Sequence, residues 1–215
     1  MHWPAPFDHP KWLFEVKLDG FRALAYIESG TARLVSRNAH TYASFASLCA
    51  EIAATVPAGD AILDGEIVCL DGDGRPQFNE LLFRRGEPCF YAFDLLSLDG
   101  DDLRDRPLLE RKRLLRRILR SCRGRVRYLD HVVGRGPELF QAARERDLEG
   151  VVAKPIGSAY RLKGDRSPWL KIKNRDYRHA RNRHGLFARW RLKRAVKEAT
   201  TGASPIPSRS TRRSR

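Results

Sequence analysis

Short apolar segments separated by tight turns constrain the fold of this chain more than any other feature of its sequence. The first three such segments are residues 12–17, 21–28 and 32–36. Asp19-Gly20 and Ser29-Gly30 stand between them and supply the turns. Apolar residues that alternate with polar ones indicate strands buried on one face, and connections this short join antiparallel neighbours. We therefore expect an antiparallel meander near the start of the chain.

The remaining segments have either strand-like or helix-like patterns. Further strands are predicted over residues 61–70, roughly 75–79, 88–96, 125–133, 149–154 and 169–173. Apolar residues at three- and four-residue spacing predict helices over 43–56 and 137–147. A third helix is predicted between them, capped by Asp105 and with Pro107 in its first turn. Strands dominate, so the predicted class is α+β, with mainly antiparallel sheets flanked by helices.

Two of these helices have a clear apolar face. The apolar positions are Phe45, Leu48, Ile52 and Val56 in the first, and Leu108, Leu115, Ile118 and Leu119 in the one after Asp105. The opposite face of the latter helix carries Arg113, Arg116, Arg117 and Arg120. These arginines could follow a phosphate backbone, but a solvated surface is the more common role of such a face, and we favour it.

The chain is long enough for one main domain, and its charge is concentrated towards the C-terminal end. Its 215 residues, 42% of them hydrophobic, can bury one sizeable core. Residues 175–215 carry 13 Lys and Arg against 2 Asp and Glu, which is +11 of the formal +15. We expect residues 1–174 to form the folded domain and residues 175–215 a basic, partly disordered extension that attracts polyanions. A solvated tail without a partner is the alternative.

The length of the apolar runs and the spacing of the cysteines indicate in which cellular compartment to expect the protein. The longest apolar runs are far shorter than the ~20 residues that a transmembrane helix needs, and Met1–Pro10 does not have the pattern of a signal peptide. The four cysteines are widely spaced, which favours reduced core thiols over a zinc site. We expect a cytoplasmic, monomeric protein that does not associate with a membrane.

The run E-V-K-L-D-G-F-R at residues 15–22 places Lys17 two positions before an Asp-Gly pair. A lysine amine can attack the α-phosphorus of a nucleoside triphosphate and hold the nucleotide as a phosphoramidate, provided that its ammonium proton is removed first. Free lysine has a pKa of about 10.4, so the surroundings must favour the neutral amine. Taken alone, the run is also compatible with an exposed lysine beside a turn.

Five further runs follow in order along the chain. They are S-R-N at 36–38, L-D-G-E at 63–66, Y-A-F-D-L-L at 91–96, E-G-V-V-A-K at 149–154 and W-L-K-I-K at 169–173. With the Lys17 run, and in this order, they resemble the nucleotidyltransferase motifs of ATP-dependent DNA ligases, most closely the ligase module of bacterial end-joining proteins. The resemblance spans about residues 3–186. It implies the nucleotidyltransferase fold shared by ligases and capping enzymes, ATP as cofactor, and Lys17 as the residue that becomes adenylylated.

The resemblance also assigns nucleotide contacts. Glu15 corresponds to the position that recognises the adenine amino group, and Phe93 to the phenylalanine that stacks on the adenine ring. Arg22 and Arg37 correspond to ribose and phosphate contacts, and Arg37 would meet the 5′-phosphate of the nick later in the cycle. Phe93 lies in an otherwise buried strand, so a role in the core is the simpler interpretation of that residue alone.

Phosphoryl transfer needs cations on the non-bridging oxygens and a metal ion at the leaving pyrophosphate. Lys171 and Lys173 are two positions apart in a strand, so both point to one face and could meet the α-phosphate. Glu66 and Glu149 stand at the ends of apolar strands, where their oxygens could hold Mg²⁺ or Mn²⁺. By resemblance, Glu149 would ligate the metal and Glu66 would also touch the ribose. We expect Asp64 to support the turn rather than to bind metal.

Full ligases follow this domain with an oligonucleotide-binding fold. Only 42 residues follow Lys173, too few and too polar for a five-stranded barrel, so we expect no such domain in residues 175–215. The predicted function is ATP-dependent sealing of nicked or broken DNA during repair or recombination, with separate end-binding or polymerase proteins as candidate partners. The alternatives are an RNA ligase, a guanylyl-transferring capping enzyme, and a non-catalytic module that binds DNA ends.

Overall fold

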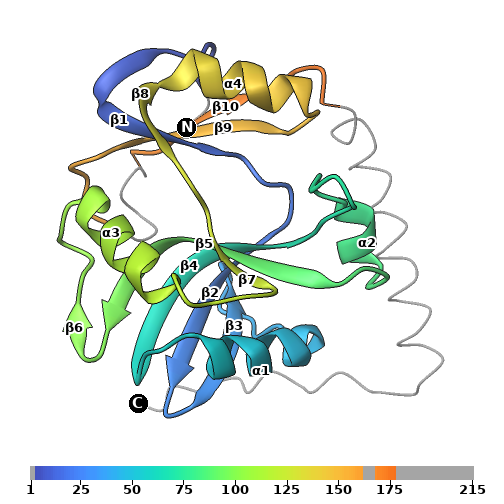
Figure 1. Ribbon diagram of the computed structural model, residues 1–215, viewed down its shortest axis with the longest axis vertical. Helices are drawn as coiled ribbons and strands as arrows, with labels where there is room; N and C mark the ends of the chain where they lie inside the picture. The colour runs from blue at the N-terminus through green and yellow to red at the C-terminus, as the bar shows by residue number, and fades with distance from the viewer. Residues whose placement is uncertain (1–2, 162–167, 178–215) are drawn as a thin grey trace, which may run out of the picture. The chain divides into compact units, whose positions relative to one another are not determined.

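Strand pairing assembles the alternating segments into two sheets (Figure 1). The computed structural model describes residues 3–161 and 168–177, which lie within the compact unit Met1–Ala180. The six-stranded sheet consists, in spatial order, of β3 (Thr31–Ser36), β2 (Phe21–Glu28), β4 (Asp60–Cys69), β5 (Pro88–Leu98) and β6 (Asp101–Asp102), with β7 (Val126–Tyr128) paired to β5. The four-stranded sheet has the order β10 (Leu170–Lys173), β9 (Gly150–Pro155), β1 (Asp8–Val16), β8 (Val132–Arg135). Only β5 and β7 pair in parallel among these strands. The predicted α+β class is confirmed.

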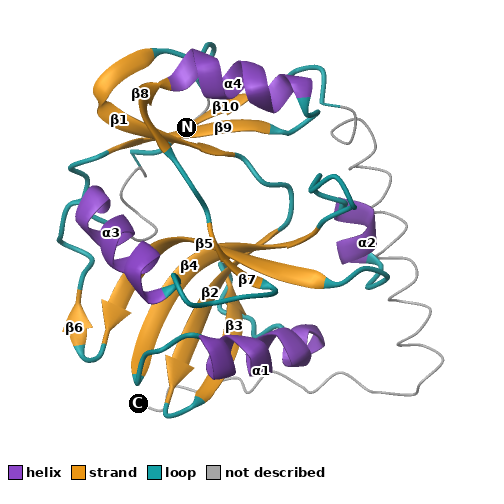
Figure 2. Cartoon of the chain, in the orientation of Figure 1, coloured by secondary structure: helices purple, strands orange, loops and turns teal. Residues whose placement is uncertain are grey.

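Helices cover both sheets. The helix α4 (Gly136–Glu145) packs against β1 and β9, and α1 (Ala46–Thr55), preceded by the 3-10 turn Ala43–Phe45, packs against β3. The helix α3 (Leu108–Ile118) packs against β5, and the short α2 (Phe78–Leu82) against β4. Figure 2 shows α4 and α1 on opposite sides of the pair of sheets, so the two sheets face each other between these helices.

The predicted apolar faces are buried. All four apolar positions of the first helical segment belong to the core of the six-stranded sheet, where Leu48 and Ile52 have no exposed surface. In α3, Leu108 and Leu115 are buried and the four arginines of the opposite face are exposed. Exposure of these arginines is compatible with a solvated face and with a face that contacts phosphates, so the preference for the former stays a prediction. The packing of the helix rests on its leucines.

A separate apolar cluster contains residues from both sheets. Its buried members are Phe93, Leu96, Leu129, Tyr160 and Trp169. Val16 of β1 and Val152 of β9 pack against it from the four-stranded sheet, and Leu24 of β2 from the six-stranded sheet. Burial of this apolar surface holds the two sheets together on one side of the described unit.

The strand predicted over 75–79 is present only as a short pairing over residues 75–77. An isolated bridge joins Leu70 to Pro76, backbone hydrogen bonds flank it on both sides, and the chain then enters α2. A carboxylate oxygen of Asp71 accepts hydrogen bonds from the backbone N–H groups of Asp73 and Arg75, at 3.0 and 2.9 Å. These bonds close a tight turn. After it, the Gln77 N–H donates to the Cys69 carbonyl oxygen at 2.7 Å, and the helix begins at the next residue.

Two predictions near the middle of the chain also need correction. The strand predicted over 125–133 is two strands, because the chain leaves β7 in one sheet and enters β8 in the other. Asp105 does not cap α3, whose first residue follows Pro107 without a side-chain cap. The Asp105 carboxylate instead accepts a hydrogen bond from the guanidinium of Arg161, at 2.7 Å.

The cysteines have the environment that their spacing predicted. All four are free thiols, and Cys69, Cys89 and Cys122 are buried. Burial raises the pKa of the Cys69 thiol to about 11, which keeps it protonated at neutral pH. Among residues 3–161 and 168–177, none of the helices has the length and apolar character that crossing a membrane requires.

Candidate active site

Lys17 directly follows β1, at the point where this strand ends beside β9. Val16 pairs with Val151, and the Lys17 N–H donates to the Gly150 carbonyl oxygen at 2.8 Å. This pairing brings Lys17 to Glu149, the residue before β9, with Lys17 Nζ 2.5 Å from Glu149 Oε2. The two side chains are only 17% and 5% exposed. A carboxylate placed this way can stabilise the ammonium or accept its proton.

Two glycines let the backbone of these motifs approach neighbouring strands closely. A Cβ atom on Gly20 would lie 2.1 Å from the carbonyl oxygen of Ile67, and one on Gly150 would lie 2.1 Å from that of Ile172. Gly150 also has φ of +133°, which residues with a side chain rarely adopt. The loop after β1 therefore lies directly against β4, and the start of β9 lies directly against β10. These contacts fix the backbone of the loop that follows Lys17 and of the strand beside Lys17.

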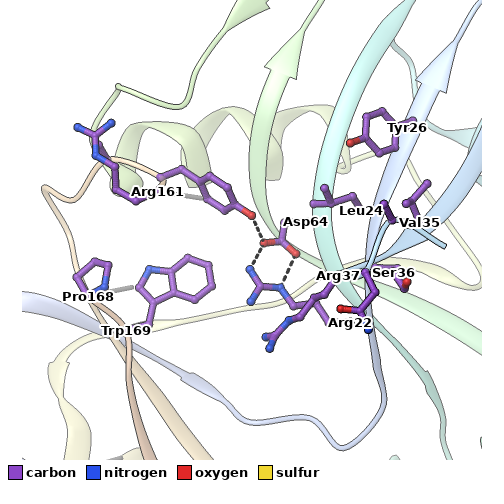
Figure 3. A pocket seen from close by; sticks show the side chains of 15 residues that line it. Arg22, Leu24, Tyr26, Val35, Ser36, Arg37, Asp64, Arg161, Pro168 and Trp169 are labelled. Carbon is purple, nitrogen blue, oxygen red and sulfur yellow. Dashed lines mark hydrogen bonds and ion pairs between the residues drawn. The ribbon is translucent and has the colours of Figure 1, made fainter. Parts of the chain in front are cut away.

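Arg22 of β2 is held by a buried carboxylate. Its Nε donates to Asp64 Oδ1 at 2.9 Å, its second guanidinium nitrogen donates to Oδ2, and the Tyr160 hydroxyl donates to Oδ2 at 3.0 Å (Figure 3). Burial acts to lower the pKa of Arg22, but the charge of Asp64 outweighs it and raises that pKa. Asp64 was expected to support a turn. It lies instead within β4 and is the counter-ion of Arg22.

Glu66 lies opposite Arg22 in the register of β2 and β4. Burial raises the pKa of the Glu66 carboxyl to about 7, although the positive charges of Lys17 and Arg22 favour its ionised form. The neutral acid is therefore favoured more at Glu66 than at an ordinary exposed glutamate. A cation bound beside it would favour the carboxylate, so the charge of Glu66 depends on what occupies the site.

The two lysines of β10 share one face of the strand, because Ile172 between them is buried on the other. Lys171 is half-buried and Lys173 is exposed. Desolvation, followed by repulsion from Arg37 and Lys17, lowers the pKa of Lys171. The structure thus brings Lys171 into the electrostatic environment of Lys17, whereas Lys173 lies further out, at the exposed end of β10.

A cavity of about 440 Å³ is lined by Arg22 and Asp64, whereas Lys17, Glu149 and Lys171 are not among its lining residues. In Figure 3, Trp169 and Arg161 lie on one side of it, and Arg22 and Arg37 lie on another. Desolvation and repulsion from Arg22 lower the pKa of Arg37. The volume falls within the range of small-molecule sites, and the lining combines aromatic and apolar surface with guanidinium groups, as recognition of a nucleotide requires.

Glu15 and Phe93 belong to a buried cluster behind Trp169. The carboxylate of Glu15 meets two ammonium groups, with Oε1 2.5 Å from Lys112 Nζ and Oε2 2.6 Å from Lys154 Nζ. Lys154 Nζ also lies 4.3 Å from the centroid of the Phe93 ring, and that ring packs edge-on against Trp169 at 5.8 Å. Burial acts to raise the pKa of Glu15, but the attraction of the two lysines outweighs it and lowers that pKa.

Sequence reasoning missed several of these residues as members of the site. They are Lys112, Lys154, Tyr160 and Trp169, together with Asp64 in its role as counter-ion. A signal was present for Lys112, because Arg111 and Lys112 lie between Leu108 and Leu115 at the spacing of the apolar face. Charged residues at such positions indicate buried ion pairs. For Tyr160, which is 96 residues away from its carboxylate partner, local sequence carries no comparable signal.

The fold agrees with the comparisons with known proteins. Residues 5–173 match the family model of the ATP dependent DNA ligase domain. The chain therefore belongs to the ATP-dependent DNA ligase domain family. The multifunctional non-homologous end joining protein LigD of Pseudomonas aeruginosa is 37% identical over 169 residues, which cover 76% of this chain and 20% of that protein. A probable DNA ligase of Streptomyces coelicolor is 36% identical over 179 residues, which cover 74% of this chain and 34% of that protein.

Solved structures place the chain in the same family. The mycobacterial DNA ligase D complexed with ATP and MES superposes with a TM-score of 0.73 at 30% identity, covering 81% of this chain and 58% of that chain. The ligase domain of Mycobacterium tuberculosis LigD gives a TM-score of 0.72 at 31% identity, covering 80% of this chain and 57% of that chain. The resemblance that the motifs predicted is confirmed. The chain spans only 20% to 34% of the length of the two curated relatives named above.

Proposed function

We propose that this chain is the catalytic domain of an ATP-dependent DNA ligase, in which Lys17 takes AMP from ATP and transfers it to a DNA 5′-phosphate. The observation that carries the proposal is the contact of Lys17 Nζ with Glu149 Oε2 at 2.5 Å. Lys171 lies close enough to Lys17 and Arg37 for their positive charges to lower its pKa. An amine paired with a carboxylate, and two further cationic groups, thus lie at or near the ends of separate strands, which supports the proposed roles. Membership of the family supports ATP as the nucleotide.

The proposed reaction has three displacements at phosphorus. In the first, the neutral amine of Lys17 attacks the α-phosphorus of ATP, a nitrogen–phosphorus bond forms, and the bond to the bridging oxygen breaks to release pyrophosphate. Glu149 or water takes the proton. In the second, a DNA 5′-phosphate oxygen attacks the same phosphorus, and the lysine amine leaves and regains a proton. In the third, a 3′-hydroxyl attacks the activated 5′-phosphate, and AMP leaves as the phosphodiester forms.

Cationic side chains would stabilise the charge that develops in each step. We assign Lys171 and Lys173 to the non-bridging oxygens of the α-phosphate, because they point to one face of β10 and Lys171 interacts with Lys17. Arg37, exposed beside the cavity, would bind the α-phosphate region first and the DNA 5′-phosphate later. Both assignments follow from position and charge.

The residues present fit a divalent cation such as Mg²⁺ or Mn²⁺. Glu66 and Glu149 offer carboxylate oxygens, the ligands that hard cations prefer. Within residues 3–161 and 168–177 there is no group of three or more His, Cys, Asp and Glu side chains placed to hold a metal. The two carboxylates would therefore share the ion with triphosphate oxygens and water, as is usual for Mg²⁺ in phosphoryl transfer. The ion would neutralise charge on the triphosphate and the leaving pyrophosphate.

The nucleoside would bind against the cluster behind the cavity. Phe93 offers an aromatic face for the adenine ring, and Glu15 offers carboxylate oxygens for its amino group. Arg22 is held by Asp64 in a fixed position, from which it can donate to the ribose. Glu66, opposite Arg22 in the sheet, is the second candidate for the ribose hydroxyls.

The substrates and partners of the whole protein form part of this proposal. We assign residues 1–174 to the catalytic domain and propose that the basic residues of 175–215 contact DNA phosphates. Residues 178–215 lie outside the described part of the chain. Nicked or broken DNA in repair or recombination is the proposed substrate, in the cytoplasm, with end-binding or polymerase proteins as partners.

Formation of the covalent adduct tests the proposal. The protein is incubated with α-labelled ATP or GTP and Mg²⁺, then denatured. A label that survives denaturation, is released by acid, and appears with ATP only is expected. Lys17→Ala should abolish it, whereas Lys11→Ala, an exposed lysine on the same strand, should retain it. A folded protein that forms no adduct with either nucleotide would overturn the enzyme assignment, and an adduct with GTP alone would indicate a capping enzyme.

Sealing assays then identify the nucleic acid. Nicked DNA and nicked RNA duplexes with labelled 5′-phosphates are compared at equal concentration, and joining of DNA is expected. Binding of nicked DNA should weaken steeply as salt rises, and deletion of residues 187–215 should reduce that slope if the extension neutralises phosphates. An unchanged slope would reject the role proposed for the extension without affecting the assignment of Lys17.

A further inference from the structure

Lys112 is fully buried, and all three of its ammonium donors are occupied by protein acceptors. Its Nζ donates to Glu15 Oε1 at 2.5 Å, to the Leu129 carbonyl oxygen at 3.0 Å and to the Phe93 carbonyl oxygen at 3.3 Å. The same atom lies 4.5 Å from the centroid of the Tyr128 ring. Because a lysine ammonium has three N–H donors, Lys112 has none left for a ligand. Any effect of Lys112 on a ligand must act through the groups that it holds.

These groups come from both sheets. Glu15 belongs to β1 of the four-stranded sheet, Phe93 to β5 of the six-stranded sheet, and Leu129 follows β7. Lys112 itself lies on α3 and reaches all three. Phe93 packs against Trp169, which lines the cavity. The ammonium of Lys112 therefore fixes the relative positions of a carboxylate and an aromatic ring directly behind the proposed nucleotide site.

The charges of this cluster do not balance. Glu15 is shared by Lys112 and Lys154, and the neighbouring Arg111 is already paired with Asp94. Three buried cations thus face two buried carboxylates, and a surplus buried charge costs stability. Burial lowers the pKa of Lys154, although the charge of Glu15 favours its ammonium form. Since Lys154 alone could neutralise Glu15, the charge of this carboxylate does not by itself require the second lysine.

We propose that Lys112 is a positioning residue for the nucleobase, holding Glu15 in the orientation that receives the base amino group and fixing the backbone of Phe93 beside it. Lys112 donates a hydrogen bond to Oε1, whereas Lys154 forms an ion pair with Oε2 without a hydrogen bond of acceptable geometry. Both oxygens therefore keep lone pairs for a base, which has to displace covering side chains because Glu15 is only 1% exposed. This inference rests on the proposed function, and it concerns which base the site prefers rather than whether Lys17 reacts.

The test compares Lys112→Met with the wild-type protein. KM and kcat for adduct formation are measured with ATP and with purine riboside triphosphate, which lacks the 6-amino group. We expect KM for ATP to rise about tenfold in the variant, kcat to stay within about threefold, and the preference for ATP over the analogue to fall about tenfold. A purely structural role would lower the melting temperature and leave this preference unchanged, and that result would overturn the inference.

Controls separate the inference from the proposed function. Arg113→Met, on the exposed face of the same helix, should behave as the wild type does. Lys112→Gln, which keeps donors without the charge, is the second variant if methionine prevents folding, and it should also reduce the preference for ATP over the analogue.

Calorimetric binding of both nucleotides adds a measurement that does not depend on adduct formation. A wild type that binds selectively but forms no adduct rejects the proposed function alone. An active wild type with an equally selective Lys112 variant rejects the inference alone.

Discussion

Replacement of Arg111 by methionine should destabilise the protein far more than replacement of Lys112, although the two residues are neighbours on α3 and both are fully buried. Arg111 forms a two-pronged pair with Asp94, from Nε to Oδ1 at 2.8 Å and from Nη2 to Oδ2 at 2.9 Å. It also donates to the Ser158 carbonyl oxygen at 3.0 Å. Arg111→Met leaves the Asp94 carboxylate buried without this partner, whereas Lys112→Met leaves Glu15 paired with Lys154.

Charge balance sets the expected magnitudes. Breaking a buried ion pair by removing one partner costs about 3–5 kcal/mol, and we expect this loss for Arg111→Met. Lys112→Met removes one hydrogen-bond donor from each of two carbonyl oxygens, at about 1 kcal/mol each, and part of this is offset by removal of the surplus charge. We expect a net loss of about 1–2 kcal/mol. In a domain of this size 1 kcal/mol corresponds to about 2–4 °C, so Arg111→Met should lower the melting temperature by about 6–20 °C.

Urea unfolding at pH 7, followed by far-ultraviolet circular dichroism, measures these losses. Arg113→Met is the exposed control and should change the free energy of unfolding by no more than about 0.5 kcal/mol. The double variant Arg111→Met with Asp94→Asn should regain part of the stability, because it removes the carboxylate charge and keeps the oxygen that accepts the Leu95 N–H. Equal destabilisation by Arg111→Met and Lys112→Met would refute the reasoning from charge balance.

Three further predictions follow from single contacts. Because the pKa of Glu66 is raised, its contribution to the free energy of unfolding is fully present below about pH 4.5 and is lost as pH rises through about 7. Glu66→Gln should remove this decline. Urea unfolding that shows the same pH dependence in both proteins would contradict the prediction. Gly20→Ala should lower the free energy of unfolding by about 1–3 kcal/mol, because the new Cβ would lie 2.1 Å from the Ile67 carbonyl oxygen. An unchanged melting temperature would be evidence against that close approach. Tyr160→Phe removes the hydroxyl that donates to Asp64 at 3.0 Å, and it should lower the free energy of unfolding in urea by about 1.5–3 kcal/mol. A variant as stable as the wild type would mean that this hydrogen bond contributes nothing.

Much of the fold could be predicted because the pattern of most strands and helices is local. The alternating segments and the apolar stripe at Leu48 and Ile52 appear in the structure with nearly the predicted bounds. The failures have a common cause. Periodicity cannot show that a strand-like run over 125–133 divides between two sheets, or that the turn at Asp71 leads away from the sheet into a helix. Both outcomes depend on where more distant segments lie.

The sequence by itself determined the class of the fold, the order of the motifs, and the lysine around which the chemistry is proposed, since these follow from local pattern and from residue type. Only the tertiary structure decided which charges meet. The contact between Lys17 and Glu149 joins residues 132 positions apart, and that between Glu15 and Lys112 joins residues 97 positions apart. Such pairs, and the raised pKa of Glu66, arise from the pairing of strands and the exclusion of water, which no local spacing along the chain specifies.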